Sequence, residues 1–562
     1  MWVLVSSGVV LTGIGVTLAV LARHVEPYLR AQIVAGLEAR FHTRVELDSF
    51  HVQVREGQEA RFGVWATGRG LRIWPPQKTG GNHALETAVN SVPLISLDEF
   101  SFHVPLRYRQ TQALRIPEVR LMGLKINVPP KPEREKQTGI EAATEQPAAP
   151  AGNAGGVGAL ANMVVERVDC QNAELVLETD KPGKLPLTFE IEKMTLKHRS
   201  AGRPMEFEAV LTNAKPKGLI HSEGSFGPWV MEDPGESPVK GTYKFDNANL
   251  GDFNGISGTL SSTGNYDGTL REMAVTGKAD VPDFALTKYG TAMKLDTDFK
   301  ARVDGTNGDT YLDEVDATLG KSKFKLQGKV VRVRTDANDK EIPVSQLGTR
   351  AAVGTGREIT MNVDVPAVRA EDFLRLVNKS GTPLMTGDLA VRAALEISPG
   401  KEPVPERIKL NGQFKLSNAR FTNEKFQARV EDLSLRGQGK PGALKNTDPA
   451  TIAATMEGSL QMAGGVVTLP DLKYDVPGAD IALQGTYAMD GGALHFDGTA
   501  RMTATVSQMV GGWKGVLLKP ADRFFKKDGA GTQVPIRVRG TRESPDFGVD
   551  LGRFGTHAEK PQ

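Results

Sequence analysis

The chain has 562 residues, and its 69 Lys and Arg residues nearly balance its 67 Asp and Glu residues, giving a net charge of +2. This balance argues against nucleic acid as the main partner, because a nucleic-acid-binding protein needs a basic surface. Glycine accounts for 61 of the 562 residues, a larger share than the average of about 7%. A high glycine content is typical of a protein with many strands and tight turns rather than of a helical enzyme. The single cysteine, Cys170, excludes an intrachain disulfide and fits the cytosol or an oxidising compartment in which one thiol cannot mispair.

The first element predicted along the chain is a membrane anchor over residues 1–23. Residues 2–22 carry no charge, and about 20 apolar residues are enough to cross the hydrocarbon core of a bilayer. A cleaved signal peptide is the alternative, but it would have a basic start and a shorter apolar core. Four arginines follow the span, and the positive-inside rule taken alone would place that side in the cytoplasm: Arg23, Arg30, Arg40 and Arg44.

An amphipathic helix is predicted directly after the anchor. Apolar residues recur every four positions, on one helical face: Val25, Leu29, Ile33, Leu37 and Phe41. Pro27 suits the first turn of such a helix. We expect this helix to cover one face of a sheet, with a helix lying on the membrane surface as the alternative. Together with the strand-like segment that follows, it defines a membrane-proximal module of helix and strands over residues 24–128.

Most of the remaining chain alternates apolar and polar residues, which predicts strands with one apolar and one polar face. Clear examples are "MEFEAVLT" (205–212), "ITMNVDVP" (359–366), "RIKLNGQFKL" (407–416) and "PIRVRG" (535–540). In two other runs the alternation changes phase at Gly123 and at Gly328, which indicates β-bulges. Because bulges bend a sheet, their repetition predicts a curved one.

Several short stretches carry turn residues. "GTNGDT" (305–310) contains the Asn-Gly pair of a tight hairpin, and "STGNYDGT" (262–269) also has turn composition. The stretch "VTGKADVPDFAL" (275–286) has a near copy, "VRGTRESPDFGV" (538–549). We interpret both copies as strand–turn–strand corners; chance similarity is the alternative, since any turn uses Gly, Pro and Asp.

Helical patterns are scarce in the C-terminal part of the chain. One covers residues 369–377 and another covers 506–527, where an apolar stripe is expected from Met509, Trp513, Leu517 and Phe524. Residues 129–158 are rich in Pro, Ala, Glu and Gly, cannot bury a core, and are predicted to be a disordered linker. This linker separates the membrane-proximal module from a long β-region over residues 159–552, which is followed by a polar tail over 553–562.

No familiar catalytic or metal-binding arrangement is present. "DGTNGD" (304–309) suggests a calcium loop, but placing Gly308 at the required glycine makes Val303 the first ligand, and the match fails. "LGKS" (319–322) lacks the earlier glycine of a phosphate loop. The nine histidines have no metal-ligand spacing. We therefore predict no catalytic, cofactor-binding or metal residue, and we do not expect an enzyme.

The chain resembles the AsmA-like family of two-membrane bacteria, which is related to bridge-like lipid transfer proteins. The resemblance rests on the N-terminal anchor and on these segments: "EPYLRAQIVAGLEARFHTRVELDSF", "PLISLDEFSFHVPL", "IPEVRLMGLKINVPP", "GISGTLSSTGNYDGTLREMAVTGKADVPDF" and "PIRVRGTRESPDFGVDL". It implies a single-pass inner-membrane protein, periplasmic for most of its length. It further implies a mainly β fold, in which a transmembrane helix precedes a long curved antiparallel sheet that forms an apolar groove.

The residues support such a groove independently. A sheet with one apolar face must cover that face, and little helix is available to do so. The sheet therefore either folds onto itself or curls into a trough whose apolar lining contacts acyl chains. If residues after 157 form about 25–30 strands spaced about 4.8 Å apart, a fully open sheet is expected to be about 120–145 Å along its curve. Strand phase places eight residues in the groove: Phe207, Leu211, Ile359, Met361, Val363, Leu410, Phe414 and Ile536.

The expected function is binding of phospholipid and its transport between the inner and outer membranes. The expected partners are phospholipid and the inner membrane, with other envelope proteins as further candidates, and no cofactor. The alternative is a structural or assembly factor for outer-membrane protein biogenesis or envelope integrity. A periplasmic enzyme that acts on glycans is a third hypothesis.

Overall fold

The computed structural model describes most of the chain between residues 26 and 549. The described residues are 26–28, 30–31, 33–39, 43–56, 62–74, 92–105, 114–128, 163–177, 186–197, 204–228, 230, 233–346, 354–378, 382–441, 454–490, 492–510, 514, 517–525, 531–541 and 544–549. The anchor, linker and tail predicted from the sequence lie outside these ranges. Within them, no helix is both long enough and apolar enough to cross a bilayer.

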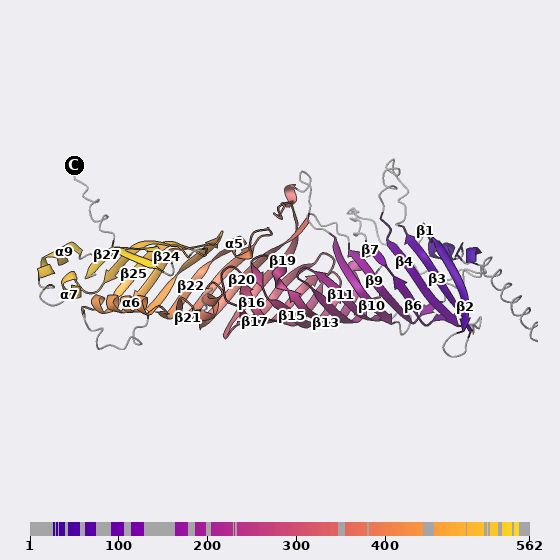
Figure 1. Ribbon diagram of the computed structural model, residues 1–562, viewed down its shortest axis with the longest axis horizontal. Coiled ribbons are helices and arrows are strands. Elements are labelled where there is room, and N and C mark those ends of the chain that lie inside the picture. Colours follow the sequence, from indigo (N-terminus) through magenta and orange to yellow (C-terminus); the bar gives the residue numbers. More distant parts are fainter. Residues whose placement is uncertain are drawn as a thin grey trace, which may run out of the picture.

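One curved sheet of 26 strands runs along the whole elongated molecule (Figure 1). Its N-terminal strands are β1 (Val45–Glu46), β2 (Ser49–Glu56), β3 (Phe62–Ile73), β4 (Ile95–Pro105), β6 (Val119–Met122), β7 (Lys125–Val128), β9 (Arg167–Leu177), β10 (Leu187–Lys197), β11 (Met205–Ala214) and β12 (Lys217–Phe226). Its central strands are β13 (Pro238–Asn249), β14 (Ile256–Ser257), β15 (Thr259–Thr269), β16 (Met273–Leu286), β17 (Met293–Asp304), β18 (Asp309–Leu319), β19 (Ser322–Thr335), β20 (Gly354–Arg369) and β21 (Met385–Ile397).

The sheet ends with seven further strands, and short helices lie in its loops. These strands are β22 (Ile408–Phe421), β23 (Ala454–Ala463), β24 (Val466–Val476), β25 (Ala479–Ala488), β26 (Leu494–Met502), β27 (Thr532–Gly540) and β28 (Pro545–Val549). The helices are α4 (Ala370–Arg375), α5 (Val404–Arg407), α6 (Glu424–Gly437), α7 (Val506–Val510), α9 (Asp522–Phe525) and the 3-10 turns η1 (Pro234–Glu236), η2 (Leu250–Asp252), η3 (Val344–Gln346) and η6 (Lys519–Ala521). The predicted mainly β fold with a few short helices is confirmed.

The sheet is mixed rather than purely antiparallel, which corrects the sequence-based expectation. Almost all neighbouring strands pair antiparallel, but β9 runs parallel to β6 and β7, and β5 (Leu114–Ile116) pairs parallel with β8 (Met163–Val165) in a separate two-stranded sheet. A parallel pair needs a connection of a dozen or more residues, and residues 129–162 supply it. The strands on both sides of the predicted linker therefore belong to one continuous sheet.

The turn predictions have mixed outcomes. "GTNGDT" joins β17 to β18 in a hairpin, and the second "PDF" copy joins β27 to β28, so both predictions are confirmed. The first copy lies entirely within β16, where the register shifts between Val281 and Phe284, so the predicted corner is a bulge in one strand. "STGNYDGT" lies inside β15 and is not a turn. In both places the turn residues bend a long strand instead of ending it.

Of the two predicted bulges, one is confirmed and one is misplaced. β6 ends at Met122 and β7 begins at Lys125, and Gly123 between them has a φ of 67°, which favours glycine. At Gly328, however, β19 has no bulge, because its register with β20 is unbroken from Lys325 to Thr335. The extra residue lies in the neighbouring strand, β18, between Leu312 and Val315.

Helices pack against the apolar face near both ends of the sheet. Ile33 and Val34 contact the N-terminal core, and the Nε of Arg30 donates to the carbonyl of Leu47 at 2.8 Å, so the predicted helix covers the sheet as expected. That core comprises Leu47, Phe50, Ala66, Leu97, Phe100, Leu124, Cys170, Ala173 and Ile191. It draws residues from both sides of the predicted linker.

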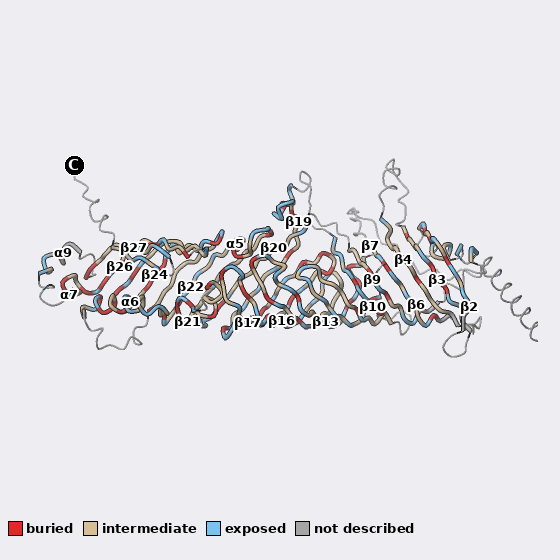
Figure 2. Tube along the Cα trace, viewed as in Figure 1, coloured by how far each residue is buried: buried red, intermediate tan, exposed pale blue. Residues whose placement is uncertain are grey.

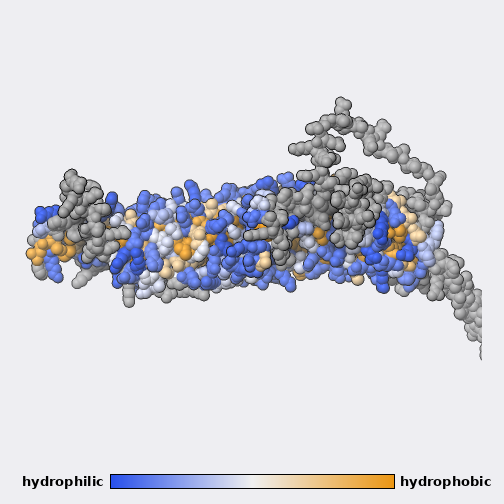
Figure 3. All heavy atoms as spheres, turned by 90° about the horizontal axis from the view of Figure 1, so that it is seen from above, coloured by the Kyte–Doolittle hydropathy of each residue, from blue (hydrophilic) through white to orange (hydrophobic). Residues whose placement is uncertain are grey.

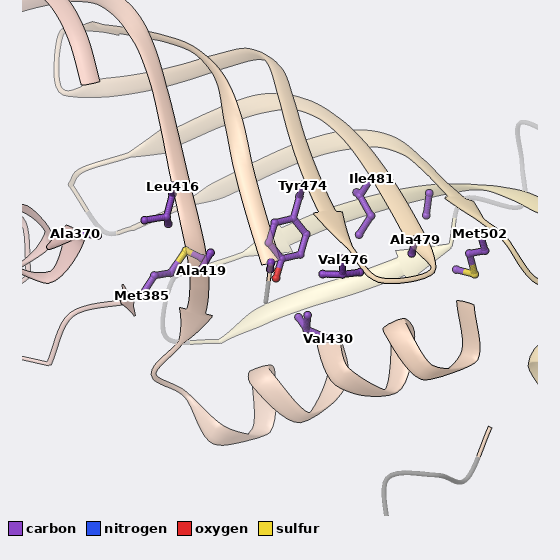
Figure 4. Packing of buried hydrophobic residues seen from close by; sticks show 12 residues of the cluster. Ala370, Met385, Leu416, Ala419, Val430, Tyr474, Val476, Ala479, Ile481 and Met502 are labelled. Atoms are coloured by element: carbon purple, nitrogen blue, oxygen red, sulfur yellow. The ribbon is translucent and has the colours of Figure 1, made fainter. Parts of the chain in front are cut away.

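At the C-terminal end α6 takes this role, and the sequence had not predicted this helix. Figure 4 shows Val430 of α6 directed toward Tyr474 and Val476 of the sheet. The helix predicted over 369–377 is present as α4, whose Ala370 and Leu374 join the same core. Of the stripe predicted over 506–527, Met509 packs on the core and Leu517 is 68% exposed, so these two residues do not share one buried face. Trp513 lies outside the described residues.

Candidate functional site

The candidate site is the apolar face of the sheet. Polar and apolar residues alternate along the strands, and exposed and buried positions alternate with them (Figure 2). The register aligns the apolar positions of neighbouring strands, because directly opposed residues in a ladder lie on the same face. On β19 and β20, for example, the apolar side is built from consecutive pairs: Leu326 with Val363, Gly328 with Met361 and Val330 with Ile359.

A single row of paired residues links strands that are far apart in sequence. It starts at Phe207 and passes through Gly224, Gly241, Tyr266, Val275, Ala301, Leu312, Gly328, Met361 and Leu395 to Leu410. Three of the eight residues expected in a groove therefore lie on one continuous line. Seen from above, hydrophobic residues appear in patches along the long axis, with hydrophilic residues around and between them (Figure 3).

The register places the other five predicted residues on the same face. Ile359 and Val363 flank Met361 in β20, and Phe414 faces Val391 one strand further on. Leu211 lies nearer the N-terminal end, opposite Ile220, and contacts the N-terminal core. Ile536 lies opposite Gly498 at the far end and packs on the C-terminal core. All eight side chains are half-buried, so they are neither packed inside a closed core nor fully exposed.

The opposite face is a lattice of charged side chains. Lys300 contacts Glu314 at 2.9 Å, Lys325 contacts Asp316 at 3.3 Å, and all four side chains are more than 40% exposed. Such exposed pairs contribute only about 0–1 kcal/mol each. Their main consequence is that this face is wet and leaves the other face as the one that can take an apolar ligand.

Glycines and tyrosines face each other across the central strands of the sheet. A Cβ added to Gly264 would lie 2.4 Å from the carbonyl oxygen of Thr276 and 2.8 Å from the Tyr243 ring. The Tyr243 hydroxyl is 3.1 Å from the Ser262 hydroxyl, and burial raises the Tyr243 pKa. The rings thus cover glycines on the inner surface, and only glycine allows this approach.

The two rims of the curled sheet meet in the central part. The loop between β13 and β15 contacts the loop between β21 and β22: Asn254 donates through Nδ2 to the Lys401 carbonyl at 2.8 Å and accepts from the Val404 amide at 2.7 Å. Lys288, between β16 and β17, contacts Glu406 at 3.3 Å and Asp490 at 3.5 Å. Because these loops belong to opposite rims, the apolar face is the inner surface of a trough whose rims touch. The crossing strands in the middle of Figure 1 agree with this.

The sequence analysis missed the polar members of the inner surface. Tyr243 and Tyr266 were not named, although both stand in phase with apolar residues of their strands. Arg332 and Arg357 were also missed, although each continues an apolar phase: Arg332 after Val330 and Arg357 before Ile359. The two-residue alternation along each strand was therefore a sufficient signal to place these four side chains on the inner surface.

No metal or cofactor site emerges from the described part of the chain. It contains no group of three or more His, Cys, Asp and Glu side chains that could hold a metal ion. Comparison of the chain with protein-family models, with curated proteins and with solved structures finds no match.

Proposed function

We propose that the trough binds the acyl chains of phospholipids and conducts these lipids along its long axis, between the inner and outer membranes. The observation that carries this proposal is the unbroken row from Phe207 to Leu410, whose residues are half-buried except for the buried Ala301. Among the described residues, α-helices cover this row's face only toward its ends. A large apolar surface of this kind marks a binding site.

The inner surface suits acyl chains better than a shaped ligand. Each Å² of apolar area removed from water contributes about 25 cal/mol, and dispersion contacts are non-specific. A ligand held in this way can move from one row to the next without losing a particular hydrogen bond. The row from Phe207 to Leu410 consists of Phe, Gly, Gly, Tyr, Val, Ala, Leu, Gly, Met, Leu and Leu. It is therefore apolar apart from the Tyr266 hydroxyl, and its mixture of sizes gives no specific shape.

The orientation between membranes is also part of the proposal, and it is supported by the uncharged segment 2–22 and by the AsmA-like resemblance. Strand order follows chain order, so an anchor there would hold the end with β2 and β3 at the inner membrane and direct β28 away from it. A phosphatase fused after Phe554 is expected to be active, as it is only in the periplasm. An inactive but well-expressed fusion would refute this topology.

The binding step is tested by purifying the full chain in detergent and quantifying its lipid by mass spectrometry. We expect phospholipid to remain bound after extensive washing with lipid-free detergent. A structural or assembly factor for envelope proteins would retain no stoichiometric lipid and would instead co-purify with protein partners. That result would reject lipid conduction and favour the assembly role.

A further inference from the structure

The inner surface carries a pair of arginines at one rim of the trough. Arg332 of β19 and Arg357 of β20 are direct partners in the ladder and therefore lie on the same face. The next pairs inward are Val330 with Ile359, Gly328 with Met361 and Leu326 with Val363. The two cations thus stand at the edge of an apolar strip instead of on the wet outer face, where Lys325 and Lys329 of β19 lie.

The two arginines differ in how they are held. Arg332 donates through Nη1 to the Asn307 carbonyl at 3.1 Å and through Nη2 to the Pro186 carbonyl at 3.3 Å, which joins the two rims. Arg357 has no carboxylate partner among the described residues. Its side chain keeps an exposed surface, while desolvation by the surrounding protein atoms lowers its pKa. Burial and the neighbouring Arg357 charge also lower the Arg332 pKa, while Asp309 opposes this effect.

Arg357 is the electrostatically incomplete member of this pair, since no carboxylate among the described residues contacts it. It lies opposite Arg332 in the ladder, and its charge lowers the Arg332 pKa. Asp309 lies near Arg332, and its Oδ1 accepts the Arg332 backbone amide at 2.9 Å. A guanidinium group presents five donors in a planar fork that matches phosphate oxygens. An anion beside Arg357 would offset the repulsion between the two cations and accept hydrogen bonds from the Arg357 guanidinium group.

The apolar strip beside the arginines has the length of a lipid chain. Four residues separate Val330 from Leu326, which is about 14 Å at the rise of an antiparallel strand. Half of a bilayer's hydrocarbon core is about 15 Å. A ligand with a phosphate at the rim and an acyl chain along the strip would satisfy both features at once.

We propose that Arg332 and Arg357 bind the phosphate group of an acyl-chain lipid whose chains lie on the adjacent rows of β19 and β20. This inference rests on the proposed function and adds to it a fixed position for the headgroup at one rim. It assigns Arg357 as the principal ligand, because Arg332 is already held by two carbonyls. The trough would then recognise the phosphate of a lipid while remaining tolerant of its chains.

The test compares two lipids with the same chains. The full chain in detergent is titrated with dioleoyl phosphatidylglycerol, which carries a phosphate, and with dioleoylglycerol, which does not. We expect Arg357→Gln to weaken retention of the phospholipid about tenfold, the effect of losing a charge-assisted hydrogen bond, and to leave dioleoylglycerol unchanged. Arg357→Lys, which keeps the charge, should lose less. Lys329→Gln is the matched control, because Lys329 lies on the exposed outer face of the same strand.

The outcomes separate the two proposals. If neither lipid is retained by the native chain, the proposed function fails. If both lipids are retained equally by the native chain and by Arg357→Gln, lipid binding stands and the arginine site is refuted. A third arm uses inorganic phosphate alone: thermal stabilisation that Arg357→Gln abolishes, together with equal retention of the two lipids, would assign the site to free phosphate and overturn the headgroup assignment.

Discussion

A carboxylate introduced at Leu410 should be far more damaging than one introduced at its neighbour. Leu410 lies on the inner surface opposite Leu395 and Met462 and is half-buried. Asn411, one residue along, is exposed on the outer face opposite Ala394 and Gln461. Leu410→Asp and Asn411→Asp therefore place the same group on opposite faces of one strand. Lys409 is a poorer control, since it contacts Glu396 at 2.8 Å and an acid there would face a like charge.

The size of the difference follows from burial. Complete burial of a leucine side chain contributes about 1.5–3 kcal/mol, so the half-buried Leu410 loses about 1 kcal/mol when it is removed. An unpaired polar group taken out of water costs a further 1–3 kcal/mol or so. We expect Leu410→Asp to lower the free energy of unfolding by about 2–4 kcal/mol and Asn411→Asp to change it by less than about 0.5 kcal/mol.

Two measurements check this prediction in the detergent-solubilised full chain: urea unfolding, and phospholipid retained per protein. Leu410→Asp should also lose lipid, because acyl chains would have to pass an ionised group. Apolar surroundings raise the pKa of the introduced carboxyl above its unfolded value. The folded state then binds the proton more tightly, so the variant's stability should fall as the pH rises through about 4. Equal effects of the two variants, or undiminished lipid retention by Leu410→Asp, would refute the reasoning.

Three further predictions concern other parts of the inner surface and its core. A photoreactive residue at Met361 should cross-link to lipid and one at the outward Thr360 should not; equal capture at both positions would contradict an inner lipid path. Gly264→Val should destabilise the sheet by about 1–3 kcal/mol through overpacking, because its Cβ would lie 2.4 Å from the Thr276 oxygen, whereas the outward Thr263→Val should be tolerated in the same unfolding assay. Cys170 is 1% exposed, and burial raises its pKa to about 11, so iodoacetamide should label it at pH 8 only after unfolding. Because the unfolded thiol ionises first, stability should also fall between about pH 9 and 11; rapid labelling of the folded chain would contradict the burial.

The sequence was most informative about which side chains share a face of the sheet. The alternation from Ile359 to Val365 predicted which side chains share a surface, because the period of two is a property of the local backbone. It was least informative about where strands end. Gly277 and Pro282 have the composition of a turn, but both lie inside β16: Gly277 where Tyr243 and Phe299 leave no room for a side chain, and Pro282 at a bulge. Many strands of this region are long, up to the 16 residues of β20, so the described residues after 157 form the strands β8 to β28, fewer than the expected 25–30 or so.

The remaining misses depend on tertiary contacts. α6 has a recognisable cap, the Asn423 side chain accepting from the Phe426 amide, but it is stabilised by packing against strands that come later in the chain, such as β24 with Tyr474. The rim contacts are more distant still: Asn254 and Lys401 are 147 residues apart. No local pattern encodes such a contact, because the curvature that brings the rims together is summed over many strands.

Because each strand pairs with its neighbours in sequence, the length of this molecule is set by the number of its strands. From β15 to β28, every successive pair of strands shares a ladder. Stability in such an array is approximately a sum of nearest-neighbour terms, so one hairpin can be duplicated or lost without rewriting the others. Each event changes the width of the sheet by two strand spacings, about 10 Å. Evolution can thus change the distance between the two helix-covered ends of the sheet in steps of one hairpin.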